Sequence, residues 1–299
     1  MNRNGVSLCR MLLVAMFVFT AAGLVAVGDE ATSAPAVADH FRRSELVAWC
    51  IVPFDATKRS PAQRAEMVQD LGLKRVAYDW RAEHVAEFEE EILQYRQHGI
   101  EFFAFWSWHD ALEPLIKKHG IHPQIWLMFA NPPEGTYDEQ VAAAAKSLLP
   151  MVEKTRELGL KLGLYNHGGW SGEPQNMIAV CRYLREHHQA DHVGIVYNLH
   201  HGHDHIADFE QQLKDMRPFL LCLNLNGMND NAQPKILPIG SGQHDERLLG
   251  IIRQSGYTGP IGVLDHRPEL DARESLQQNL TGLGAVLKKM NDSASESFE

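Results

Sequence analysis

The feature that most constrains this chain is a regular alternation of short apolar segments with amphipathic ones. Between the apolar segments, apolar residues recur at helical spacing, as in residues 83–98, where Gly99 follows as a stop signal. Strand and helix in alternation predict a parallel sheet. The predicted strands span residues 46–53, 74–79, 101–106, 124–130, 160–166, 192–198, 219–226 and 260–265.

Polar residues follow directly after several of these strands. About eight strand–helix units predict an α/β fold that closes into a single (β/α)₈ TIM barrel, with its chemistry at the carboxyl ends of the strands. The polar residues at those ends are Asp79, His109, Asn131, Asn166 with His167, Asn198 with His201, Asn224 with Asn226, and Asp265 with Arg267.

The first 28 residues have the pattern of a secretory signal peptide. Arg3 and Arg10 precede an apolar run over residues 11–27, and small residues close it. A membrane anchor is the alternative, because the run is near the lower length limit of a spanning helix. We expect an exported protein, secreted or periplasmic and free of the membrane after cleavage. Residues 29–43 are predicted as a flexible linker, 44–290 as the barrel and 291–299 as a polar tail.

The charge and the cysteines narrow the class of protein. A formal charge of −10 and the lack of a basic stretch argue against a nucleic-acid partner. Cys50, Cys181 and Cys222 remain after signal cleavage, and we expect them to be buried free thiols.

Two stretches are the main candidates for ligand binding. In residues 165–170, two glycines allow a sharp turn that exposes Asn166 and His167, with Trp170 as a flat apolar wall; a structural turn is the alternative. Residues 197–205 hold the densest group of imidazoles, from which Asn198 and His201 are predicted to face substrate. The facing of the neighbouring imidazoles stays open, and their spacing matches no strong metal motif.

Further candidates lie at other strand ends. Asn224 and Asn226 alternate onto one face, and neutral amides suit hydroxyl groups. Asp265 ends the last strand and is either a general base or the ion-pair partner of Arg267. Trp106 and His109, at the third strand, complete the predicted substrate-binding set.

With these residues in place, the chain resembles the xylose isomerase-like TIM barrels, a group of sugar isomerases, epimerases and endonuclease-fold relatives. The resemblance is carried by residues 165–169, 194–201, 239–245 and 255–265. It implies a divalent metal held by acids and a histidine from the last four strands. The corresponding residues here are Tyr165, Asn198, Asn224 and Asp265, three of them neutral, so the ligands of a metal are not identified.

Two functions fit these residues. The first is an exported sugar isomerase- or epimerase-like (or lyase-like) enzyme that transfers a proton next to a carbonyl of a small carbohydrate, with Asp265, His201 and His167 as catalytic groups. The second is a carbohydrate-binding barrel that has lost the metal site and the reaction. Endonuclease activity, suggested only by fold relatives, disagrees with the acidic charge. The identity of the sugar and the oligomeric state are not determined by the sequence.

Overall fold

The computed structural model describes residues 39–299. The predicted signal peptide and residues 29–38 of the predicted linker lie outside the described residues. Within residues 39–299, no helix is both long enough and apolar enough to cross a membrane.

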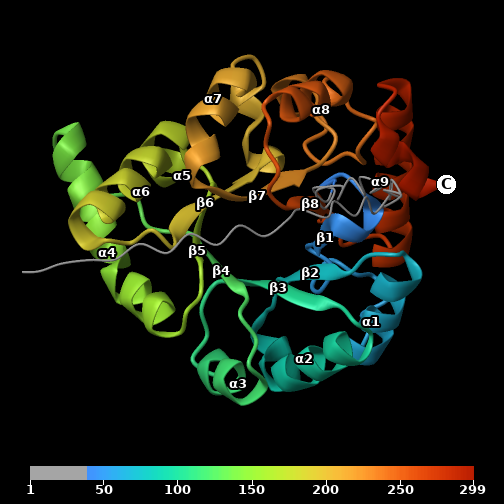
Figure 1. The fold of residues 1–299 in the computed structure, drawn as a ribbon, viewed down its shortest axis with the longest axis horizontal. Coiled ribbons are helices and arrows are strands. Elements are labelled where there is room, and N and C mark those ends of the chain that lie inside the picture. Colours follow the sequence, from blue (N-terminus) through green and yellow to red (C-terminus); the bar gives the residue numbers. More distant parts are fainter. Residues whose placement is uncertain (1–38) are drawn as a thin grey trace, which may run out of the picture. The chain divides into compact units, whose positions relative to one another are not determined.

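Eight parallel strands form a closed barrel in the order in which they occur along the chain (Figure 1). Strand β1 closes the barrel by pairing with β8, Leu46 opposite Ile261 and Trp49 opposite Leu264. The strands are β1 (Leu46–Trp49), β2 (Arg75–Tyr78), β3 (Glu101–Trp106), β4 (Gln124–Leu127), β5 (Leu162–Tyr165), β6 (Val193–Asn198), β7 (Leu220–Leu225) and β8 (Ile261–Leu264). The predicted single TIM barrel is therefore confirmed.

Helices surround the barrel between successive strands (Figure 1). They are α1 (Pro61–Asp70), α2 (Phe88–Gln97), α3 (Leu112–His119), α4 (Tyr137–Glu157), α5 (Gly169–Gly172), α6 (Pro174–His188), α7 (Phe209–Met216), α8 (Asp245–Gln254) and α9 (Ala272–Lys289). Ser60 begins α1 with a reciprocal cap to Gln63, and Pro61 takes the first helical position. The predicted helix 83–98 divides into a 3₁₀ helix (Ala82–Glu87) and α2, and α5 is a short addition.

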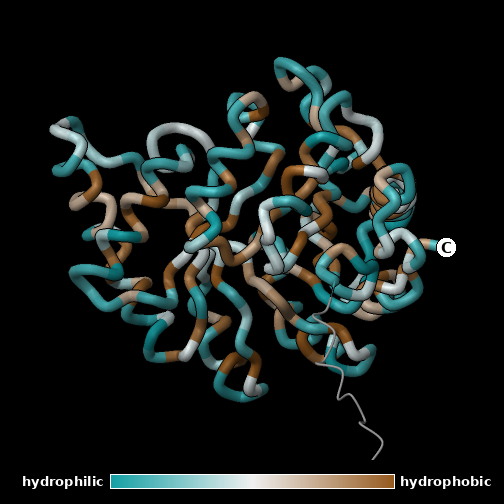
Figure 2. The backbone as a smooth tube through the Cα atoms, turned by 45° about the horizontal axis from the view of Figure 1, so that its top comes forward, coloured by the Kyte–Doolittle hydropathy of each residue, from teal (hydrophilic) through white to brown (hydrophobic). Residues whose placement is uncertain are grey.

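The hydrophobic residues form two layers. One lies between the strands and the surrounding helices, and in Figure 2 hydrophobic and hydrophilic stretches accordingly alternate along the helical segments. The other fills the barrel itself and is rich in aromatic side chains. The rings of Trp49 and Trp126 lie 4.8 Å apart, and those of Trp106 and Tyr165 lie 4.6 Å apart. The interior is thus a packed core rather than a channel.

Both ends of the described chain are packed against the barrel. Phe41 is completely buried, and Asp39 and Asp292 both pair with Arg253, at 2.8 and 2.5 Å. The last residues form a 3₁₀ helix (Ser293–Phe298) that packs on α9. Phe41 in the predicted linker and Phe298 in the predicted polar tail are apolar residues through which these two segments contact the core.

Candidate functional site

A small cavity of about 80 Å³ opens at the carboxyl ends of the strands, where the barrel fold places its chemistry. Its floor is aromatic and consists of Trp49, Trp106 and Tyr165, which also belong to the barrel core. Polar and ionisable side chains from the loops after β1, β2, β5, β6 and β8 form its walls.

Asp79 is the carboxylate that lines this cavity. It follows β2 and is buried; its Oδ1 accepts a hydrogen bond of 3.2 Å from the backbone N–H of Val52, and its Oδ2 has no partner. Burial raises the pKa of Asp79 to about 7, and the nearby positive charge of Arg81 opposes that rise. The same burial, together with Asp79, raises the pKa of the adjacent Cys50 thiol. Near neutral pH, Asp79 can therefore both accept and release a proton.

Four imidazoles that line the cavity form a continuous row. The ring centroids of His167 and His201 lie 4.4 Å apart, those of His201 and His200 4.4 Å, and those of His200 and His266 5.1 Å. Burial lowers the pKa of His200 to about 3 and that of His201 to about 2, with Lys235 and the other imidazoles adding to the effect. These two rings are neutral at physiological pH, so each offers one N–H donor and one acceptor.

A hydrogen-bonded frame holds the end of β6. Tyr165 Oη accepts hydrogen bonds from Trp49 Nε1 at 3.4 Å and from Asn198 Nδ2 at 2.5 Å. Asn166 bonds the backbone of Asn198 twice: its Oδ1 accepts from the N–H at 2.7 Å, and its Nδ2 donates to the C=O at 3.1 Å. Asn166, predicted to bind substrate, instead positions Asn198.

The backbone is strained at three of the strand ends. Cys50 after β1, Ser107 after β3 and His266 after β8 have φ angles of 62°, 58° and 50°. This left-handed conformation is uncommon for residues other than glycine and costs roughly 1–3 kcal/mol at each position. Two of these residues, Cys50 and His266, line the cavity. Strain that persists at one end of a barrel is typical of a functional site.

Asp265, predicted as a catalytic residue, is not among the residues that line this cavity. Residues on β8 alternate, so Leu264 points into the barrel and the next residue points outward. Ser275 on α9 donates its hydroxyl to Asp265, and burial raises the pKa of Asp265 to about 8. Nor does Arg267 pair with Asp265: it donates to Gln278 Oε1 at 2.8 Å and to the Ser275 carbonyl at 2.9 Å.

The other predicted residues divide into two groups. Trp106, His167, Asn198 and His201 line the cavity. The remainder lie outside it. Trp170 packs beside Tyr137, His109 beside Trp80 and Phe88, Asn224 over Gly262, and Asn226 bonds the Gly227 carbonyl.

The residues at the metal positions of the resemblance do not fit a divalent cation. The side chains of Tyr165 and Asn198 are hydrogen-bonded to each other, and the carboxylate of Asp265 lies outside the barrel, where it accepts a hydrogen bond from Ser275. Over residues 39–299, no group of three or more His, Cys, Asp or Glu side chains is arranged to hold a metal ion. The aromatic floor occupies the place where acidic ligands would be needed.

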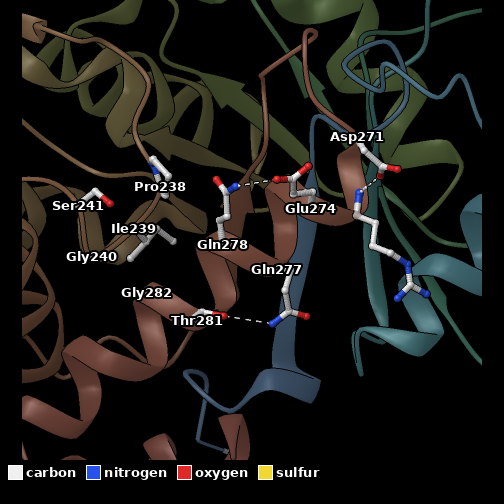
Figure 3. A pocket seen from close by; sticks show the side chains of 11 residues that line it. Pro238, Ile239, Gly240, Ser241, Asp271, Glu274, Gln277, Gln278, Thr281 and Gly282 are labelled. Carbon is white, nitrogen blue, oxygen red and sulfur yellow. Dashed lines mark hydrogen bonds between the residues drawn. The ribbon is translucent and has the colours of Figure 1, made fainter.

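A larger groove, of about 750 Å³, shares no residue with this cavity and lies between α9 and residues 238–241 (Figure 3). Its polar side chains bond to one another along the helix: Gln277 donates to Thr281 and Gln278 to Glu274. Of the two hollows, we assign function to the smaller, because it combines a proton-active carboxylate, neutral imidazoles and strained strand ends.

Sequence reasoning missed several cavity residues: Trp49, Cys50, Phe54, Arg81, His200 and His266. Arg81 follows Asp79 by two residues, and His266 lies between Asp265 and Arg267, both of which are predicted site residues. Side chains alternate along a strand, so with Leu264 inward at the end of β8, Asp265 points outward and His266 inward. The sequence does not show where β8 ends and so does not reveal this.

Comparisons with known proteins support the fold. No protein-family profile matches the chain, and no curated protein sequence matches it. Among solved structures, the apo form of the 3-keto-D-glucoside 4-epimerase YcjR from E. coli has a TM-score of 0.59 at 16% identity, covering 79% of this chain and 99% of that one. The IolI protein with a bound zinc atom has a TM-score of 0.62 at 14% identity, covering 82% and 98%. D-psicose 3-epimerase, crystallised in the presence of D-fructose, has a TM-score of 0.56 at 13% identity, covering 80% and 99%. The chain therefore has the xylose isomerase-like TIM-barrel fold, which it shares with sugar epimerases.

Proposed function

We propose that this protein is an exported, sugar isomerase- or epimerase-like enzyme that moves a proton next to the carbonyl group of a small carbohydrate. The observation that carries the proposal is the pairing of Asp79, whose pKa lies near 7, with neutral imidazoles in one cavity. In acid–base sites, two titratable groups commonly lie close together in environments that shift their pKa values in opposite directions.

The residues suggest how the step would proceed. Ionised Asp79 takes the proton from the carbon beside the carbonyl, so the C–H bond breaks, an O–H bond forms on Asp79, and the electron pair passes into an enediolate. Neutral His200 or His201 donates a hydrogen bond to the enediolate oxygen. In isomerisation, Asp79 returns the proton to the former carbonyl carbon, and the hydroxyl proton on the original carbon passes to the former carbonyl oxygen. In epimerisation, a proton from solvent reaches the opposite face of the original carbon, and Asp79 releases its own proton to solvent.

A carbohydrate suits the cavity and its rim. The faces of Trp49 and Trp106 can pack on the apolar side of a sugar ring. A volume of 80 Å³ equals that of about three water molecules, whereas whole ligands occupy pockets of roughly 300–1,000 Å³. The cavity therefore takes the reacting end of the sugar, and the remainder lies at the rim beside the exposed His167. The neighbours named above as epimerases of a keto-glucoside and of psicose act on molecules of this class.

Deuterium exchange tests the reaction. The protein is incubated in D₂O with a panel of aldoses, ketoses and sugar acids, and the C–H next to the carbonyl is followed by NMR. Exchange is expected with the wild type, to fall by two orders of magnitude or more in Asp79→Asn, and to persist in Asp265→Asn. Asp265 is the matched control because it is equally buried, with a raised pKa, yet lies outside the cavity. Equal exchange in Asp79→Asn and the wild type would refute the role of Asp79.

The second candidate function is carbohydrate binding without catalysis. The mutual bonding of Trp49, Tyr165 and Asn198 favours it, because it leaves a rigid and largely filled interior. Saturable sugar binding by calorimetry, with no exchange over the whole panel, would support the binder and exclude the enzyme.

Export rests on the N-terminal pattern. Cell fractionation followed by N-terminal sequencing of the mature protein is expected to give a chain that begins near Asp29 in the periplasm or the medium. A full-length chain in the cytoplasmic fraction would contradict export.

A further inference from the structure

Arg81 is a cation at the mouth of the cavity with no acidic partner. Its guanidinium lies over the ring of Phe54, 5.5 Å from the centroid, and its Nη1 donates to the Trp80 carbonyl at 2.7 Å. Among residues 39–299, no carboxylate lies within ion-pair distance of Arg81. Part of its hydrogen-bonding capacity is therefore available to a ligand.

Lys235 adds a second positive charge. It is exposed, on the loop between β7 and α8, and Gly227 and Leu237 bridge the base of that loop. The loop's 3₁₀ helix (Asp230–Ala232) packs on another (His203–His205), beside the imidazole row. The charge of Lys235 contributes to the lowered pKa of both His200 and His201.

Carboxylates are scarce among the residues that line the cavity, although the exposed Asp204 and Asp230 lie on the two 3₁₀ helices near Lys235. Asp79 is the one carboxylate that lines the cavity in the described part of the chain, and burial keeps it largely protonated below about pH 7. Asp55, which follows the cavity residue Phe54 in the sequence, forms an ion pair with Arg59 at 2.8 Å. Among the described residues that line the cavity, the one permanently charged side chain is thus the cation Arg81, on a protein whose formal charge is −10. A charged cleft of one sign attracts ligands of the opposite sign.

We propose that the substrate is a sugar acid, a small polyhydroxylated carboxylate whose carboxylate binds Arg81 while its reacting carbon lies over Asp79. Arg81 supplies a planar donor pair that matches a carboxylate. Lys235 attracts the anion from the loop without needing direct contact. This inference rests on the proposed function and specifies the class of sugar.

Calorimetry with matched ligand pairs tests it. D-glucuronate and D-galacturonate are compared with D-glucose and D-galactose, and D-gluconate with D-glucitol, at low and high salt. We expect the acids to bind at least tenfold more tightly than their neutral partners, and the difference to shrink in high salt. Arg81→Gln should weaken binding of the acids roughly tenfold or more and leave the neutral sugars unchanged. Lys235→Gln should give a smaller loss and a weaker salt dependence.

Two substitutions serve as controls for net charge. Arg182 and Lys214 are exposed on α6 and α7, away from the cavity, so Arg182→Gln and Lys214→Gln should leave binding of the acids as in the wild type. If these controls weaken binding as much as Arg81→Gln does, overall charge rather than Arg81 selects the anion, and the inference is overturned.

The remaining outcomes separate this inference from the proposed function. Neutral sugars that bind as tightly as the acids and undergo exchange would overturn the inference and leave the function standing. Acids that bind through Arg81 without exchange would support the inference and refute the function. If hexose phosphates bind more tightly than uronates, the recognised group is a phosphate rather than a carboxylate, and the inference is overturned. Binding of no sugar at all would overturn both.

Discussion

Replacing Asp79 with Asn is expected to stabilise the folded protein as the pH rises. Burial raises the pKa of Asp79 from 3.8 to about 7, so the folded chain binds this proton more tightly than the unfolded chain does. The stabilising contribution is complete below pH 3.8, declines as the pH rises and is lost above about pH 7. Asn resembles the protonated carboxyl and does not titrate, so the variant avoids the decline.

The size of this effect on the free energy of unfolding follows from the difference between the two pKa values of Asp79, 3.8 in the unfolded chain and about 7 in the folded one. One pKa unit corresponds to about 1.4 kcal/mol, so ionisation of Asp79 in the folded state costs about 4 kcal/mol as an upper bound. Between pH 5 and 8 the advantage of Asp79→Asn over the wild type should grow by about 3 kcal/mol. This change with pH is independent of any fixed effect of the substitution on packing, because that effect is the same at both pH values.

Urea unfolding of both proteins at pH 5, 6, 7 and 8 measures the free energy of unfolding directly. Asp265→Asn is the control, because the pKa of Asp265 is also raised, to about 8, and its variant should show the same sign of effect. The two variants should differ in exchange activity, which only Asp79→Asn loses. A constant difference between Asp79→Asn and the wild type across this pH range would refute the argument that Asp79 is desolvated.

Two further predictions concern the fold. Glu91→Ala should lower the free energy of unfolding by about 3–5 kcal/mol in urea titrations, because it leaves the buried Arg64 without the carboxylate that it contacts at 2.6 Å; a loss below 1 kcal/mol would show that Arg64 finds water. Gly163→Ala should cost about 1–3 kcal/mol, since its new Cβ would lie 2.5 Å from Val196 Cγ2 inside the barrel. The matched Gly250→Ala, in α8 with nothing within 4 Å of its Cβ, should instead gain about 0.4–1 kcal/mol, and equal effects at both sites would contradict the packing argument.

The order and type of the secondary-structure elements could be read from the sequence because both depend on local pattern. Each predicted strand overlaps an observed one, and the caps at Ser60 and Gly99 lie where composition indicates. A barrel places the ends of all its strands at one rim, so the general location of the site followed from the element order alone. This is why Trp106, His167, Asn198 and His201 were singled out and do line the cavity.

Which face each strand-end side chain takes could not be read in this way. Strands of a parallel barrel are buried on both faces, so their apolar runs carry no alternation to show which residues point inward. Shifts of register in β2 and β6, and left-handed backbone at Cys50 and His266, then turn individual side chains. A shift of one residue along a strand exchanges its inward and outward faces. For this reason the sequence could not show that Asp265 points away from the barrel interior, toward Ser275 on α9.

The sequence by itself therefore determined the barrel, the order of its strands and the end at which its polar groups gather, because those follow from periodicity and from short connections. Only the tertiary structure decided that Asp79, rather than Asp265, lines the same cavity as the imidazole row, and that aromatic rings form the floor of that cavity. Those outcomes depend on burial and on side-chain direction, which arise from contacts between segments far apart along the chain. The raised pKa of Asp79 has the same origin, since desolvation is a property of the packed barrel and not of the residue.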